Sequence, residues 1–188
     1  MARFRSPRAP VPLDPNRLEE LALRYVGRYA TTRAKLCAYL ARKVRARGWD
    51  GAQEPDLTGL ARRFSELGYV DDAAYALSKS QSLSSRGYGK RRLEEKLKLA
   101  GIGEEDGAAA RDHAAGQRVE AALRYAERRR IGPFALTPAD PKQREKAIAA
   151  MVRAGHPFGI ARVIADLPPG VEPDKKELRE RFGNRSLT

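Results

Sequence analysis

The stretch from Phe64 to Ile102 decides the fold of this chain. It contains Glu66-Leu67-Gly68-Tyr69-Val70-Asp71-Asp72 and, farther on, Gly89-Lys90-Arg91-Arg92-Leu93-Glu94-Glu95-Lys96-Leu97. Gly68 follows apolar residues at helical spacing, at a place where a left-handed residue commonly ends a helix. Asp71 or Asp72 can then cap the next helix, and Gly89 marks the break before another. The stretch predicts three consecutive helices, the last of them strongly basic.

Apolar residues recur at helical spacing on both sides of this stretch. Helices are therefore expected from about residue 16, over 32–48, 57–67, 72–86 and 90–100, from 104, from 117, over 140–155 and 157–167, and briefly around 176–182. Pro168-Pro169-Gly170 ends the helix expected over 157–167. The fold class predicted is all-α.

Internal similarity groups these helices into repeats. Ala22-Leu23-Arg24-Tyr25 recurs as Ala122-Leu123-Arg124-Tyr125, and Leu36 and Leu40 correspond to Leu93 and Leu97, then to Ala147 and Met151. The predicted architecture is an elongated array of three tandem three-helix repeats, at residues 17–70, 71–116 and 117–168. A basic, proline-broken tail (1–16) with Arg3, Arg5 and Arg8 precedes them, and a charged tail (169–188) follows. Such an array offers a long surface rather than one deep pocket.

Charge points to a polyanionic or acidic partner. Among 188 residues, 37 are Lys or Arg and 24 are Asp or Glu, so the formal net charge is +13. An excess of this size favours nucleic acid or an acidic protein as the partner. Cys37 is the single cysteine, which suits a reducing cytoplasm. No apolar run approaches membrane-spanning length. We expect a cytoplasmic monomer without a membrane partner.

Residues for catalysis or metal binding are not arranged in any pattern typical of a site. His113 and His156 have no metal-ligand spacing with each other or with Cys37, and no phosphate-binding loop is present. His156 before Pro157 indicates a turn or cap, and His113 a solvated position. Asp71-Asp72 fits helix capping better than a paired-carboxylate site. The chain is predicted to be no enzyme, with no cofactor and no metal.

Clustered cations carry the strongest functional signal. Arg86, Lys90, Arg91 and Arg92 lie at the start of a helix, where added positive charge is locally unfavourable unless something compensates it. We therefore predict partner or DNA binding by Arg86, Lys90, Arg91, Arg92, Lys96 and Lys98, with Arg62, Arg63, Arg128, Arg129 and Arg130 as secondary patches. The alternative is an ordinary solvated face on which Glu94 and Glu95 pair with the arginines.

The central stretch also resembles the RecX family. The resemblance rests on Leu67 to Asp72, Tyr75, Ala76, Gly89, Arg91, Arg92, Leu93, Leu97, Gly101 and Ile102. It implies three tandem three-helix repeats that regulate the RecA recombinase. By this resemblance the protein binds in the helical groove of the RecA–DNA filament and mostly inhibits ATP hydrolysis, strand exchange and co-protease activity. Weaker electrostatic binding to single- or double-stranded DNA is also implied. The alternative function is a direct DNA binder, such as a helix-turn-helix-like nucleoid or transcription factor.

Overall fold

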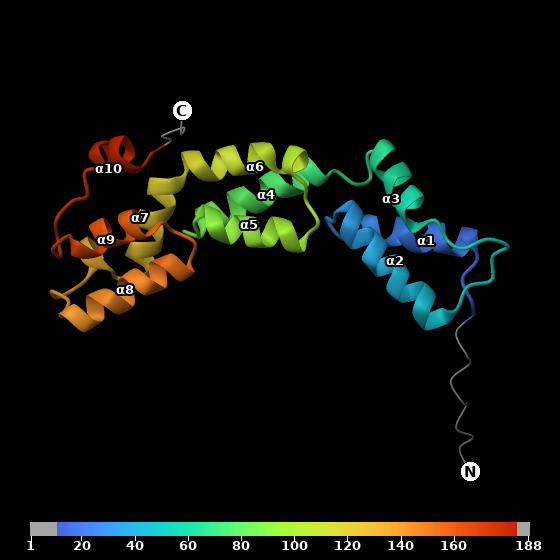
Figure 1. Ribbon diagram of the computed structural model, residues 1–188, viewed down its shortest axis with the longest axis horizontal. Coiled ribbons are helices and arrows are strands. Elements are labelled where there is room, and N and C mark those ends of the chain that lie inside the picture. The colour runs from blue at the N-terminus through green and yellow to red at the C-terminus, as the bar shows by residue number, and fades with distance from the viewer. Residues whose placement is uncertain (1–10, 184–188) are drawn as a thin grey trace, which may run out of the picture. The chain divides into compact units, whose positions relative to one another are not determined.

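The computed structural model describes residues 11–183, which form helices and connecting loops (Figure 1). The helices are α1 (Pro15–Val26), α2 (Arg33–Arg47), α3 (Leu57–Glu66), α4 (Asp72–Ser85), α5 (Lys90–Leu99), α6 (Glu104–Gly116), α7 (Arg118–Arg129), η1 (Gly132–Phe134), α8 (Pro141–Arg153), α9 (Phe158–Asp166) and α10 (Lys175–Phe182). Over residues 11–183 the extended structure is limited to an isolated bridge between Leu13 and Trp49. The prediction of an all-α fold is confirmed.

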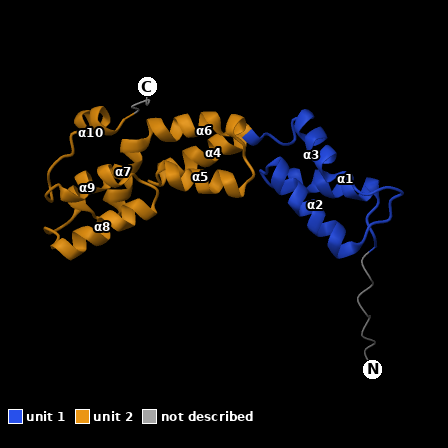
Figure 2. Cartoon of the chain, viewed as in Figure 1, with its two compact units in different colours: residues 1–72 blue, residues 73–188 orange. Residues whose placement is uncertain are grey.

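Two compact units divide the chain, residues 1–72 and residues 73–188 (Figure 2). In the first, α1, α2 and α3 enclose a core of Leu13, Leu18, Ala22, Leu36, Leu40, Ala61, Phe64 and Val70. Side-chain caps define where these helices begin. Asp14 accepts from the amide of Arg17 at 2.8 Å, and Asp56 accepts from that of Gly59 at 2.8 Å. These carboxylates satisfy amide donors that the helix leaves unpaired.

The segment before α1 is part of the first unit's core. Leu13 is fully buried; its amide donates to the carbonyl of Gly48 at 3.0 Å and its carbonyl accepts from Asp50 at 2.7 Å. The sequence predicted a tail over residues 1–16, but one apolar side chain and two backbone hydrogen bonds order its last residues. Arg3, Arg5 and Arg8 of the predicted tail lie outside the described residues.

Asp72, one of the two aspartates predicted to cap α4, also contacts a helix distant in sequence. It is buried, and its carboxylate accepts from the backbone amide of Arg33 at 2.9 Å and from Arg33 Nε at 3.1 Å. Arg33 is the first residue of α2. The carboxylate therefore stabilises the positive end of α2, a helix distant in sequence.

The second unit contains two hydrophobic clusters. Residues of α4, α5 and α6 form one, with Ala76, Leu83, Leu93, Leu97, Ala100, Ile102, Ala110 and Ala114. The other involves α7, α8, α9 and α10, and includes Val119, Ala122, Tyr125, Met151, Ile160, Ile164 and Leu178. Each of the three hydrophobic clusters in the described chain consists mainly of residues from one predicted repeat. The repeat boundaries themselves stay a prediction.

The C-terminal segment packs as a helix. Leu178 of α10 is buried in the α7–α9 cluster, and Arg179 Nε donates to Glu120 of α7 at 2.7 Å. Arg118 Nη1 donates to the carbonyl of Phe182 at 2.8 Å. The sequence predicted only a brief helix within a charged tail at 169–188. Two apolar residues, Leu178 and Phe182, on an otherwise charged helix are a weak signal, because their burial depends on a surface that other helices provide.

The start of α5 lies directly against the end of α8 (Figure 1). The amide of Gly89 donates to the carbonyl of Ala154 at 3.0 Å, and that of Arg91 donates to Gly155 at 3.3 Å. Gly155 has φ +98, and a Cβ there would lie 2.6 Å from the amide nitrogen of Arg92. Backbone N–H groups at the start of α5, which lack partners within that helix, thus donate to carbonyls at the end of α8, which lack partners within theirs. The positive end of the α5 dipole also lies beside the negative end of the α8 dipole.

His156 completes this contact. It is 3% exposed, and Nε2 lies 2.9 Å from the carbonyl of Gly87. Since a carbonyl can only accept, Nε2 carries the proton and Nδ1 is the bare nitrogen; Nδ1 is buried without a partner. The expected turn or capping role therefore becomes a buried hydrogen bond. His113, predicted to be solvated, is half-buried and lies 2.9 Å from Ser80 Oγ.

In the described part of the chain, every helix is too short or too polar to cross a lipid bilayer.

Gly155→Ala is expected to destabilise the second unit by about 3 kcal/mol or more, because strained backbone and a close approach coincide there. Gly170→Ala is the matched control: φ is +79, but a Cβ would meet open space, so a loss of only about 1 kcal/mol is expected. Urea unfolding followed by circular dichroism measures both. Equal losses would show that steric contact at Gly155 contributes nothing.

Burial lowers the pKa of His156 below its ordinary value of 6.5, although the hydrogen bond to Gly87 acts in the opposite direction. The folded state therefore favours the neutral ring, and its contribution to stability is complete above about pH 6.5 and lost as pH falls below it. The melting temperature should drop as the pH falls from about 6.5 to about 5. The His156→Gln variant should lack the part of this decrease in melting temperature that comes from protonation of the ring. An unchanged pH dependence in the variant would exclude His156 as its source.

Candidate partner-binding surface

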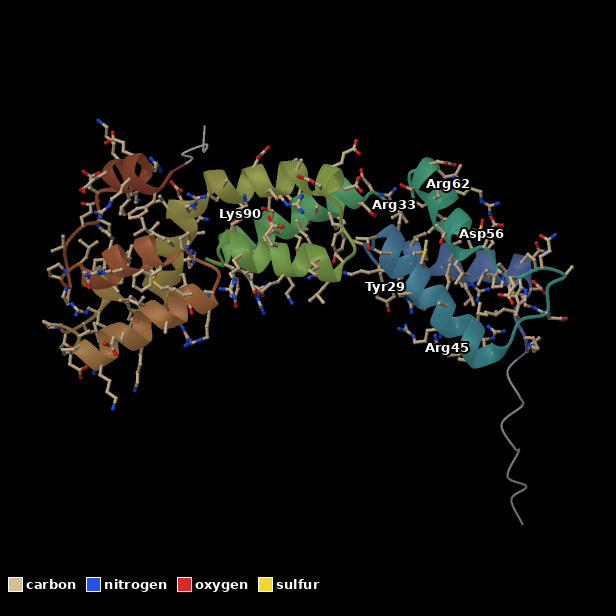
Figure 3. The ribbon with its side chains drawn as sticks, viewed as in Figure 1. Tyr29, Arg33, Arg45, Asp56, Arg62 and Lys90 are labelled. Carbon is tan, nitrogen blue, oxygen red and sulfur yellow. The ribbon has the colours of Figure 1, made fainter. Side chains whose placement is uncertain are left out.

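The predicted cations at residues 90–92 occupy the first turn of α5. Gly89 is the N-cap, and this turn, which the structure describes in full, contains no acidic side chain. Lys90 and Arg91 are exposed and Arg92 is half-buried (Figure 3 labels Lys90). The sequence therefore placed these side chains correctly at a helix N-terminus.

Two sources of negative charge lie next to these cations. Glu95 pairs with Arg92 at 2.7 Å and with Arg91 at 3.8 Å, while Glu94 pairs with Arg111 at 3.1 Å. The C-terminal carbonyls of α8 accept from the backbone of the same turn. The local cost of placing cations at this helix end is thus partly offset inside the molecule. By itself, that cost does not require an external partner.

Packing of α5 against α8 creates a concave arginine-rich site of about 480 Å³ in the second unit, here called the Tyr88 pocket. Its lining includes Tyr88, Arg92, Tyr125, Arg128, Arg129 and Arg153, together with Ala150 and Ala154. The Arg128 guanidinium lies 5.6 Å from the ring centres of both Tyr88 and Tyr125. Arg86 lies 5.3 Å from the Tyr88 ring. The rings hold the guanidiniums in place by cation–π attraction while leaving their N–H donors available.

The fold therefore unites one group of the predicted site residues. Arg92, Arg128 and Arg129 line the Tyr88 pocket, and Arg86 contacts its tyrosine. In contrast, Lys96 and Lys98 lie farther along α5, and Arg130 follows α7 in a left-handed conformation with φ 53. In the first unit, Arg62 pairs with Glu66 at 3.6 Å and Arg63 pairs with Glu19.

The sequence did not identify the other aromatic and cationic lining residues, Tyr88, Tyr125 and Arg153. Tyr88 lies between two glycines, Tyr125 belongs to an apolar stripe, and Arg153 ends α8 as an ordinary C-terminal cation. The sequence signal that could have found Tyr125 was its recurrence at the position of Tyr25. Nothing local to residues 88 or 153 connects them, because tertiary packing brings them together.

The side chains of this surface suit an anionic group. Guanidiniums donate bidentate hydrogen bonds to phosphate or carboxylate oxygens. Over residues 11–183, no cluster of three His, Cys, Asp or Glu side chains could hold a metal ion. Cys37 packs against the first core with Sγ 3.3 Å from the carbonyl of Leu57, and burial raises the pKa of its thiol. Cys37 is thus a small, partly buried side chain of the first core.

The structure is thus an all-helical chain with an arginine-rich concave surface, and comparison with known proteins identifies its family. The model described as "RecX, second three-helix domain" matches residues 71–110. Over 174 residues, covering 88% of this chain and 92% of the relative, the sequence is 33% identical to "Regulatory protein RecX" of Myxococcus xanthus. It is 30% identical over 148 residues to the protein of that name in Thermobifida fusca, covering 77% of this chain and 75% of that one. The chain belongs to the RecX family, whose members are named as regulatory proteins.

Replacing Glu95 by Gln should strengthen binding to a polyanion, because it releases both Arg91 and Arg92 from their common carboxylate. Glu94→Gln is the matched control, since it changes the net charge equally but releases Arg111 instead. Elution from immobilised heparin should require more salt for Glu95→Gln than for Glu94→Gln. Identical elution would mean that only net charge matters.

Proposed function

We propose that this protein binds the RecA–DNA filament in its helical groove and inhibits RecA. The observation that carries this proposal is the 33% identity to a RecX regulatory protein across nearly its whole length. The arginine-rich surface supports it, because such a surface fits an acidic protein face or DNA phosphate. The inhibition would extend to ATP hydrolysis, strand exchange and co-protease activity.

Occupancy of the groove is sufficient for this regulation. A protein seated there excludes both incoming duplex DNA and the repressor that the filament helps to cleave. If it binds one arrangement of RecA subunits more tightly than another, it also shifts the filament toward that arrangement. Neither effect needs a bond to be made or broken by the regulator. Repeats at 17–70, 71–116 and 117–168 would each contribute contacts to successive positions along the filament.

The decisive experiment is a titration of the protein into RecA on single-stranded DNA while ATP hydrolysis is recorded. Inhibition should be substantial at amounts well below those of RecA. Binding to naked DNA is measured separately across a salt series. A direct DNA binder, the alternative function, would show a steep salt dependence and would inhibit an unrelated DNA-dependent ATPase equally. RecA turnover that stays unchanged at equal stoichiometry would refute the proposal.

The double substitution Arg91→Ala with Arg92→Ala should raise the concentration needed for half inhibition about tenfold, because charge-assisted contacts worth about 1.4 kcal/mol are lost. Helicity should be unchanged. The matched control is Lys175→Ala with Lys176→Ala, which removes two exposed cations from the first turn of α10. Equal inhibition by wild type and the arginine variant would remove α5 from the binding surface.

A further inference from the structure

The first unit contains a second concave site, of about 760 Å³, between α1 and α2. We call it the Tyr29 site; its lining includes Arg24, Tyr25, Arg28, Tyr29, Tyr39 and Arg42. It shares none of these residues with the predicted partner-binding set. Figure 3 labels Tyr29 beside α2, and Arg45 farther along that helix.

The three tyrosines of this site form a connected aromatic group. Tyr25 and Tyr39 stack with ring centres 4.1 Å apart and 14° between their planes. Tyr29 lies 5.3 Å from Tyr25, at 50°. Cations border the group, with Arg42 at 5.7 Å and Lys43 at 5.5 Å from the Tyr39 ring. Tyr29 is 53% exposed, so a flat partner can reach its ring.

The Tyr29 site and the Tyr88 pocket occupy equivalent positions in the repeat. Ala22–Tyr25 matches Ala122–Tyr125, and Leu36 and Leu40 match Ala147 and Met151. In this register, positions 25, 28, 29, 39 and 42 correspond to 125, 128, 129, 150 and 153. All of the former line the Tyr29 site and all of the latter line the Tyr88 pocket. Two separate cores thus present the same part of the repeat as a concave basic surface.

The residues that the two sites share, and those in which they differ, indicate which ligand each site suits. Both retain a tyrosine at 25/125 and arginines at 28/128 and 42/153. Tyr29 and Tyr39, by contrast, correspond to Arg129 and Ala150. The shared arginines suit an oxyanion, and the accessible ring at position 29 is particular to the first unit. A ligand of the Tyr29 site is therefore expected to carry both an anionic oxygen and a flat ring.

We propose that the Tyr29 site binds single-stranded nucleic acid, with phosphodiester oxygens on Arg28 and Arg42 and a base stacked on Tyr29. Stacking on an exposed aromatic ring next to cations is the usual basis of sequence-tolerant single-strand binding. Duplex DNA keeps its bases paired and cannot supply that stacking contact. An acidic peptide would use the arginines alone. The proposal goes beyond RecA regulation, since it requires no RecA.

The test uses the full chain and a fluorescently labelled short oligothymidylate, with anisotropy measured across a salt series. Tyr29→Ala should weaken binding about tenfold, the size of a lost stacking contact, without changing the salt slope. Tyr29→Phe should bind like wild type, because it keeps the ring. Arg28→Ala should lower the slope of log affinity against log salt by about 0.7, the contribution of one phosphate contact on a single strand.

Arg45→Ala is the matched charge control, since Arg45 is exposed on α2 and lies outside the site. Its effect should be smaller than that of Arg28→Ala. Polyglutamate serves as a probe without bases, and its affinity should not respond to Tyr29→Ala. Three results would each overturn the proposal: no oligothymidylate binding by wild type, unchanged binding by Tyr29→Ala, or equal effects of Arg28→Ala and Arg45→Ala. RecA ATPase inhibition, measured on the same variants, tests the regulatory proposal independently.

Discussion

The end-to-end contact between α8 and α5 is the interaction on which the second unit depends. Amides of Gly89 and Arg91 donate to the carbonyls of Ala154 and Gly155, so two helix ends satisfy each other's unpaired backbone groups. Glycines are required because a side chain at 155 would collide with the backbone of Arg92. The buried His156 adds a hydrogen bond to Gly87. This contact holds the basic first turn of α5 against the end of α8, and Arg92 thereby lines the same pocket as residues of α7 and α8.

This arrangement changes how the cations at the start of α5 are understood. In an isolated helix, Lys90, Arg91 and Arg92 would repel the positive end of the dipole. Here the negative end of the α8 dipole lies beside the positive end of α5, and Glu95 pairs with both Arg91 and Arg92. Cations can therefore collect at this corner at little cost to stability. Their guanidiniums remain available to an external oxyanion because pairing in water is weak and easily exchanged.

Arginine next to tyrosine is the recurring chemistry of both concave sites. The rings hold the guanidinium planes by cation–π attraction, while the N–H donors stay free for phosphate or carboxylate. Equivalent repeat positions provide this arrangement in two different cores. Surfaces of this kind suit binding by shape and charge. Such a mode of action fits a family whose members are named as regulatory proteins.

The sequence by itself determined the helices and the cations. Local signals were strong there: Asp56 and Asp140 cap their helices, and apolar residues recur on one face of each. The first turn of α5 was also predictable, because Gly89 breaks the chain immediately before it. Only the tertiary structure decided that Tyr88 and Arg153 line the same pocket as Arg92. The same is true of the burial of Leu13 and Leu178 in hydrophobic cores. It is also true of the contact by which Asp72 stabilises the start of α2. The physical reason is the same in each case. Capping and periodicity act over a few residues along the chain, whereas these contacts depend on which surfaces distant helices bury against one another.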